Sequence, residues 1–206
     1  MKQLLLDIKP AAPPSLDNFV VGRNAEALAS LTDILSGTQL RQFTFPTFIY
    51  LWGNAGSGKS HLLQACQTRN AHIADDVNLL NEQAQIDLFN RYNSLKETGG
   101  ILITAGSHAP NQMHLRDDLA TRLAWGLVYQ LHPLNDAEKA LALNHHAAER
   151  GMHLPKEVLD YCLRYLKRDL STLMATIDAL DEWSLTTKKP VTVPMLRQLL
   201  QFPLNL

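Results

Sequence analysis

The sequence lacks the features that mark several common classes of protein. It has only two cysteines, Cys66 and Cys162, which stand too far apart for a metal-binding or redox motif. Neither sign of charge dominates, since 19 basic residues face 20 acidic ones and the net charge is −1. This balance argues against broad electrostatic binding to nucleic acid, although it leaves room for a local basic patch.

Long apolar runs are missing too, so no segment is predicted to span a membrane, and the run at residues 4–6 is too short for a signal peptide. Hydrophobic residues still make up 46% of the chain and charged residues 19%, which is typical of a folded globular protein. We therefore expect a cytoplasmic protein of one large or two small domains, with both cysteines as buried thiols and no membrane partner.

The strongest positive signal is residues 53–60, Gly-Asn-Ala-Gly-Ser-Gly-Lys-Ser, which match the P-loop pattern G-x-x-x-x-G-K-[ST] at every fixed position. The apolar residues 48–52 before them are typical of a buried parallel strand. Helical spacing of apolar residues follows, at Leu62, Leu63 and Cys66. The alternative is a glycine-rich turn between a strand and a helix.

Each fixed residue of a P-loop has a chemical reason. Glycines let successive backbone N–H groups turn inward around a phosphate, and the next helix presents its positive N-terminal end there. Lys59 can reach the β- and γ-phosphates, and the Ser60 hydroxyl is placed to bind Mg²⁺. The predicted phosphate-binding residues are Gly53, Gly56, Gly58, Lys59 and Ser60.

Residues 16–24, Leu-Asp-Asn-Phe-Val-Val-Gly-Arg-Asn, precede a predicted helix at 25–35. They resemble, over seven consecutive positions, the FDNFVVG-x-x-N box of the DnaA branch of AAA+ proteins. The resemblance implies that Val20, Val21 and Gly22 hold adenine, so ADP or ATP is the expected nucleotide. Without the family, the apolar residues are a turn into a helix.

Residues 71–76, Ala-His-Ile-Ala-Asp-Asp, predict a short strand that ends in carboxylates. The resemblance implies that Asp75 lies on the Mg²⁺ side and that Asp76 polarises the attacking water; the alternative is a strand with a polar cap. Only 14 residues separate Ser60 from Asp75. A full AAA+ domain has a further strand and helix there, so we expect this pair to be missing. In the family sheet order 5-1-4-3-2, its loss leaves the strand at 71–75 on an edge.

Residues 81–95 predict a helix closed by Gly99 and Gly100, and residues 101–104 predict the central strand beside the P-loop strand. The family has an acidic or other polar sensor residue beyond that strand. This chain has Ala105, Gly106 and Ser107 there, so only a neutral hydroxyl could take that role.

Residues 117–126, Asp-Asp-Leu-Ala-Thr-Arg-Leu-Ala-Trp-Gly, resemble the DLASRLDWG box of the same family. The resemblance implies that Arg122 is an arginine finger that acts in trans on a neighbouring subunit's nucleotide. The alternative is a surface ion pair on a helix. Trp125 is expected to have a packing role, and residues 127–131 predict another strand.

From Asn135 onward the pattern is helical. Asn135 and Glu138 predict a capping box, Gly151 ends that helix, and further helices are predicted at 156–167, 171–185 and 194–201. The resemblance places the lid arginine that contacts phosphates at Ser171; Arg168 lies one turn away and could compensate. We expect a tail at 1–14, an α/β domain at 15–133 and a helical lid at 134–206.

The tail combines an apolar and amide cluster with a proline-rich spacer, Lys-Pro-Ala-Ala-Pro-Pro. It resembles the peptide that partners insert into the bacterial sliding clamp, with Asp7 at a position that is usually apolar. The alternative is that the tail docks on its own domain. The predicted clamp-binding residues are Gln3, Leu4, Leu6 and Ile8.

The sequence therefore predicts an α/β P-loop AAA+ module with a parallel sheet and a C-terminal helical lid. It ends where DnaA-type proteins begin their DNA-reading domain, so sequence-specific DNA binding is not expected. The resemblance implies a regulator of replication initiation that binds ADP or ATP with Mg²⁺, binds the sliding clamp and promotes ATP hydrolysis by DnaA. Its intrinsic ATPase is expected to be weak or absent, and the AAA+ interface would allow self-association. The alternatives are a helicase-loader-like ATPase and a nucleotide-free AAA+ scaffold.

Overall fold

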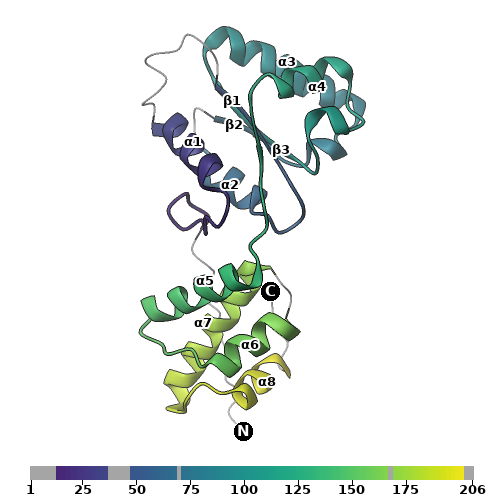
Figure 1. Cartoon of the computed structure of the whole chain (residues 1–206). Coiled ribbons are helices and arrows are strands. Elements are labelled where there is room, and N and C mark those ends of the chain that lie inside the picture. Colours follow the sequence, from purple (N-terminus) through teal and green to yellow (C-terminus); the bar gives the residue numbers. More distant parts are fainter. Residues whose placement is uncertain (1–12, 37–46, 69–70, 167–168, 202–206) are drawn as a thin grey trace. The chain divides into compact units, whose positions relative to one another are not determined.

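A computed structural model describes residues 13–36, 47–68, 71–166 and 169–201 of the chain (Figure 1). These residues divide into two compact units, which meet in the sequence between Pro133 and Leu134. The first unit is built on a sheet, and the second contains helices only among its described residues.

The sheet of the first unit has four described strands in the order β2-β3-β1-β4, and all its neighbouring strands are parallel. Their bounds are β1 Thr47–Trp52, β2 Ala71–Ala74, β3 Ile101–Gly106 and β4 Leu127–Gln130. The predicted P-loop strand β1 and central strand β3 are thus confirmed as neighbours. They are paired from Thr47 with Ile101 to Trp52 with Gly106.

Helices cover both faces of this sheet (Figure 1). On one face, α1 Ala25–Ser36 and α2 Lys59–Ala65 pack against Ile49 and Leu51 of β1. On the other, α3 Glu82–Thr98 and α4 Asp117–Ala124 pack against Phe48 and Tyr50. Successive side chains of a strand point to opposite faces, so an uninterrupted apolar strand needs a cover on each side.

The short strand β2 lies at one edge of the sheet. Among the described residues it pairs only with β3, and its four side chains are partly exposed. The order β4-β1-β3-β2 is the expected family order without its second strand. The predicted loss of a strand–helix pair is therefore confirmed, and the resulting edge is short, as protected edges usually are.

Local capping signals explain several helix boundaries. Asn81 accepts a hydrogen bond from the N–H of Ala84 at the start of α3, and Gly99 ends that helix with φ 75°. Asn135 and Glu138 form the predicted capping box at the start of α5. Each side chain satisfies a backbone N–H group that the first helical turn leaves without a partner. One-turn 3₁₀ helices at Val77–Leu79 and Pro110–Gln112 complete the first unit.

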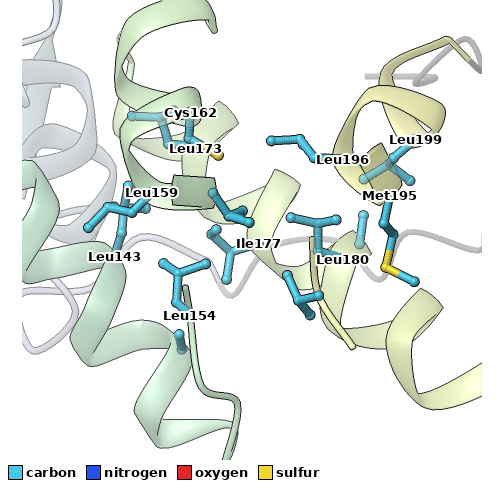
Figure 2. Packing of buried hydrophobic residues seen from close by; sticks show 14 residues of the cluster. Leu143, Leu154, Leu159, Cys162, Leu173, Ile177, Leu180, Met195, Leu196 and Leu199 are labelled. Atoms are coloured by element: carbon cyan, nitrogen blue, oxygen red, sulfur yellow. The ribbon is translucent and has the colours of Figure 1, made fainter. Parts of the chain in front are cut away.

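The second unit packs α5 Asp136–Glu149, α6 Lys156–Tyr165, α7 Leu170–Thr187 and α8 Val193–Gln201 around one apolar core (Figure 2). Helix α7 is longer than predicted at both ends, because Asp169 caps it and Lys188 ends it with φ 53°. Cys162 lies in this core and Cys66 in the core of the first unit, as predicted. Burial raises the pKa of both thiols to about 11, so they stay protonated and unreactive.

Candidate nucleotide-binding site

The predicted site residues of the first unit follow the carboxyl ends of its parallel strands. The P-loop follows β1, Asp75 follows β2, and Ser107 follows β3. In the sheet register, Trp52 pairs with Gly106 and Ala74 pairs with Thr104. These segments therefore meet at one edge of the sheet, where open α/β folds bind their ligands.

The backbone of the P-loop has a conformation that depends on glycine. Gly53, Gly56 and Gly58 have φ values of 152°, 77° and 94°, which other residues rarely adopt. A Cβ at Gly53 would overlap the carbonyl oxygen of Leu131, and one at Gly58 would lie 2.7 Å from the Phe19 ring. The loop thus forms a narrow cradle of backbone groups in front of α2.

Lys59 closes this cradle. Its Nζ donates hydrogen bonds to the carbonyl oxygens of Gly53 at 2.7 Å and Asn54 at 3.1 Å. Desolvation lowers the pKa of the Lys59 ammonium, while the carboxylates of Asp75 and Asp76 act in the opposite direction. An ammonium has three N–H donors, so one is left for a phosphate.

The structure brings together the two residues predicted to bind Mg²⁺. The Ser60 hydroxyl donates a 2.7 Å hydrogen bond to Oδ2 of Asp75. Oδ1 of the same carboxylate accepts from the backbone N–H of Asp76 at 2.8 Å. Mg²⁺ is commonly held by one or two protein oxygens together with phosphate and water, and this pair fits that chemistry.

Asp76, the residue predicted to polarise water, has an unusual backbone. Its φ is 47° and its ψ is 44°, the left-handed conformation that costs a non-glycine residue about 1–2 kcal/mol. Its side chain is exposed beside Asp75, and the residue begins the 3₁₀ turn at Val77–Leu79. Strain of this kind often persists at functional sites, and the role of Asp76 in polarising water stays a prediction.

Ser57 tests whether the cradle fits a phosphate. Its side chain is only 4% exposed, and its Oγ is the one buried side-chain oxygen or nitrogen without a hydrogen-bond partner in the described part of the chain. A buried hydroxyl without a partner is costly, and a phosphate oxygen or water would satisfy it. The glycine cradle, Lys59 and the Ser60–Asp75 pair likewise fit a nucleoside phosphate with Mg²⁺.

The segment with the predicted adenine residues is fastened to the P-loop helix. Val20 and Val21 are half-buried, and Phe19 before them is buried against Gly58. His61 of α2 contacts the carbonyl oxygen of Ser15 through Nε2 at 3.1 Å, and its ring lies 5.5 Å from that of Phe19. The contacts that Phe19 and His61 make here were not predicted from the sequence.

The end of the same segment is tied to the chain beyond β4. The Asn24 side chain donates to the carbonyl oxygen of His132 at 2.9 Å and accepts from its N–H at 2.8 Å. A cavity of about 310 Å³ next to it is lined by residues of α1, β4 and their neighbours rather than by the P-loop. The cavity therefore does not include the predicted phosphate-binding residues.

Ser107 lies directly after β3, where the predicted sensor position falls. Its hydroxyl is hydrogen-bonded to Nδ1 of His108 at 2.9 Å, and its N–H donates to Oδ1 of Asn78 at 3.0 Å. The Tyr50 hydroxyl donates to the carbonyl oxygen of His108 at 2.7 Å, which fixes the same turn. The neutral hydroxyl predicted at this position is present and has a histidine partner.

Arg122 lies in the last turn of α4 and contacts aromatic rings. Its guanidinium carbon is 4.5 Å from the ring centroid of Trp125 and 5.8 Å from that of Tyr92. Trp125, for which a packing role was predicted, contacts Arg122 but is not part of the core, because its side chain is 63% exposed. It sits at the end of α4, just before the edge strand β4, with Nζ of Lys96 from α3 5.7 Å from its ring centroid.

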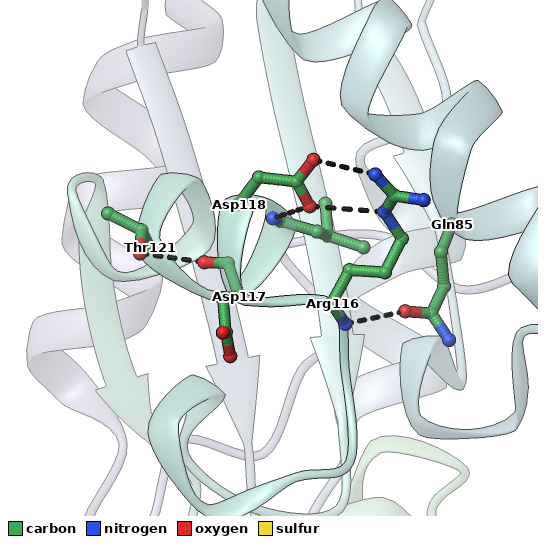
Figure 3. Close-up of polar contacts among 6 residues, drawn as sticks. Gln85, Arg116, Asp117, Asp118 and Thr121 are labelled. Carbon is green, nitrogen blue, oxygen red and sulfur yellow. Dashed lines mark hydrogen bonds and ion pairs between the residues drawn. The ribbon is translucent and has the colours of Figure 1, made fainter.

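A buried glutamine fixes the start of α4 (Figure 3). Gln85, 8% exposed, accepts from the N–H of Arg116 at 2.9 Å and donates to the carbonyl oxygen of Leu80 at 3.0 Å. The Arg116 guanidinium binds both oxygens of Asp118 and holds the pKa of that carboxyl below its usual range. Gln85 is a further residue that the sequence did not single out.

Several predicted residues cannot be placed at this site. Gln3, Leu4, Leu6, Ile8 and Arg168 lie outside the described residues. Ser171 is exposed on α7 of the second unit. Among the described residues, no three or more histidine, cysteine or acidic side chains form a metal-binding group, and no helix is long and apolar enough to cross a membrane.

A P-loop with a partnered carboxylate, on a parallel sheet followed by a helical unit, is the arrangement expected of an AAA+ module. Residues 136–200 match the family model described as Hda, lid domain. Among solved structures, domain III of the Thermotoga maritima replication initiation protein DnaA is similar, with a TM-score of 0.71 and 22% identity. That match covers 94% of this chain and 98% of the other.

Two other structures widen the comparison. AMPPCP-bound DnaA from Aquifex aeolicus matches with a TM-score of 0.65 and 20% identity, over 88% of this chain and 71% of that one. The Thermotoga maritima RuvB Holliday junction branch migration motor matches with a TM-score of 0.64 and 14% identity, over 92% and 72%. At these identities the likeness concerns the fold. The chain is thus a DnaA-like AAA+ protein in fold, with an Hda-like lid, and the resemblance predicted from the sequence is confirmed.

Proposed function

We propose that this protein is a DnaA-related regulator of replication initiation. It holds ADP or ATP at its own P-loop, binds the sliding clamp through its N-terminal tail and promotes hydrolysis of the ATP bound to DnaA. The observation that carries the proposal is the combination of a DnaA-like fold with a lid of the Hda type in one chain. The resemblance of residues 117–126 to the arginine-finger box supports a role for Arg122 in trans.

The residues at the P-loop edge of the sheet suit a site that binds a nucleotide and keeps it bound. Backbone N–H groups of the glycine cradle and the free N–H of Lys59 would bind phosphate oxygens, and Ser60 and Asp75 would hold Mg²⁺. Bound Mg²⁺ would neutralise phosphate charge. Val20 and Val21, held by the contacts of Phe19 and His61, would lie against the base. The neutral Ser107 and the serine at position 171 favour holding over rapid turnover.

Lys59→Ala is expected to weaken ADP binding by about 10- to 150-fold, because a charged hydrogen bond contributes about 1.5–3 kcal/mol. Isothermal titration calorimetry of ADP with Mg²⁺ measures this loss, and Lys156→Ala on an exposed face of the lid is the control. No ADP or ATP binding by the unaltered protein would favour a nucleotide-free scaffold. Steady-state ATP hydrolysis that depends on Lys59 would favour a helicase-loader-like ATPase.

Clamp binding is tested on the tail. Gln3→Ala combined with Leu4→Ala is expected to abolish retention of the full chain on immobilised sliding clamp, because it removes the amide and an apolar anchor of the predicted peptide. Lys9→Ala, outside the predicted cluster, is the control and should be retained normally. Equal retention of the double variant and the unaltered protein would remove clamp binding from the proposal.

A further inference from the structure

An exposed tryptophan beside the proposed arginine finger is the starting observation. Trp125 is 63% exposed, although tryptophan is among the side chains with the most apolar area to bury. Arg122 lies over its ring with the guanidinium carbon 4.5 Å from the centroid, well within the range of a cation–π contact. The ring thus stays exposed on the same helix end that presents the guanidinium.

The Arg122 guanidinium also contacts a second aromatic ring, that of Tyr92. Tyr92 of α3 is 3% exposed, and the Arg122 guanidinium carbon lies 5.8 Å from its centroid. The Tyr92 ring packs against that of Phe48 on β1, with centroids 4.2 Å apart, so the sheet holds it in place. Arg122 therefore contacts both a fixed, buried ring and an exposed one.

The backbone fixes the position of Trp125 at the end of α4 as well. The N–H of Trp125 donates to the carbonyl oxygen of Arg122 at 3.2 Å, which ends α4. A Cβ at the next residue, Gly126, would press on the Phe48 carbonyl at 2.5 Å. The chain can therefore pass directly from Trp125 into β4, and the tryptophan is held at the helix end.

We propose that Trp125 and Tyr92 form an aromatic seat that positions the Arg122 guanidinium for the nucleotide of a partner AAA+ domain. The inference rests on the proposed function, and it makes Trp125 a positioning residue. A free arginine side chain samples many rotamers, and ordering it on binding opposes association and catalysis. Stacking orders the side chain before the partner arrives, while a planar guanidinium keeps its in-plane N–H donors available for phosphate oxygens.

The hydrolysis of DnaA-bound ATP, in the presence of DNA-loaded clamp and the full chain, tests the seat. Trp125→Leu keeps apolar bulk but removes the π face, so stimulation should fall by about 2- to 30-fold. Trp125→Phe keeps a ring and should restore most of it. Lys96→Ala is the control, because it removes a cation that lies 5.7 Å from the Trp125 centroid without touching Arg122.

Nuclear magnetic resonance of the free protein gives a readout that does not depend on hydrolysis. The Arg122 side-chain protons should show an upfield ring-current shift in the unaltered protein and in Trp125→Phe, and lose most of it in Trp125→Leu. Preserved shifts elsewhere in the first unit show that each variant is folded. No ring-current shift in the unaltered protein would overturn the inference.

The outcomes separate the inference from the function on which it rests. If Arg122→Ala stimulates hydrolysis normally, the finger role assigned to Arg122 in the proposed function fails, and the seat has no role in hydrolysis. If Arg122→Ala is inactive but Trp125→Leu is fully active, or more active, the seat alone is rejected. Equal loss in Trp125→Phe and Trp125→Leu would also reject it, because the indole would then contact the partner directly.

Discussion

Arg122→Ala is expected to lower the protein's stimulation of ATP hydrolysis by DnaA by about 10³-fold or more, with clamp retention unchanged. An arginine finger supplied in trans stabilises charge on the transferring phosphoryl group and contributes 10³–10⁵ in rate. Arg122 fits this role because its guanidinium lies at the end of α4, beside the exposed ring of Trp125. Among the residues that the structure describes, no carboxylate forms an ion pair with it. Single-turnover hydrolysis of labelled ATP preloaded on DnaA measures the effect.

Two further variants sharpen the experiment. Arg122→Lys keeps the charge but loses the planar fork, so it should recover only a small part of the rate. Arg91→Ala removes an exposed arginine of α3 and should behave like the unaltered protein. Normal stimulation by Arg122→Ala would contradict the finger role, and loss of clamp retention in this variant would show that the defect lies in docking.

Much of the site could be predicted because its signals are local. The P-loop pattern fixes Lys59 and Ser60 as neighbours at the end of one loop. The short strand that ends at Asp75 can likewise be predicted from consecutive residues. The structure then joins Ser60 to Asp75 by a hydrogen bond. The edge position of β2 could also be predicted, because the short interval between these residues leaves no room for another strand and helix.

The parts that escaped prediction depend on contacts between distant residues. Phe19 and His61 fasten the segment with the predicted adenine residues to α2, and the partner of His61, Ser15, lies 46 positions away. Gln85 reaches Arg116 over 31 positions. No local periodicity encodes such pairings, because the fold alone brings the partners together.

The exposure of Trp125 also could not be predicted from local sequence. A packing role is expected for this residue, but packing in the core also requires an element to cover the side chain. Strand β4, which follows at once, is the edge of the sheet in the described structure, and Leu127 on it is 45% exposed. Exposure at a sheet edge is a property of the topology, so a single helix sequence could not predict it.

Gly53→Ala is expected to destabilise the first unit by about 3 kcal/mol or more, the largest stability effect among single P-loop substitutions. Gly53 has φ 152°, and a Cβ there would overlap the Leu131 carbonyl oxygen. That oxygen cannot move away easily, because Leu131 is 1% exposed and its N–H donates to the carbonyl of Trp52 at 2.6 Å. Either the P-loop or the end of β4 must shift.

Gly56→Ala is the matched control within the same loop. Gly56 also has a positive φ, 77°, but a Cβ there would meet no atom within 4 Å. It should cost only about 1–2 kcal/mol, the backbone cost alone. Urea unfolding followed by tryptophan fluorescence, in a Trp183→Phe background that leaves only Trp52 and Trp125 of the first unit, compares the two midpoints at a common slope. Equal midpoints would mean that the close approach of Leu131 does not hold the P-loop, and that backbone strain alone explains why glycine is required at its first position.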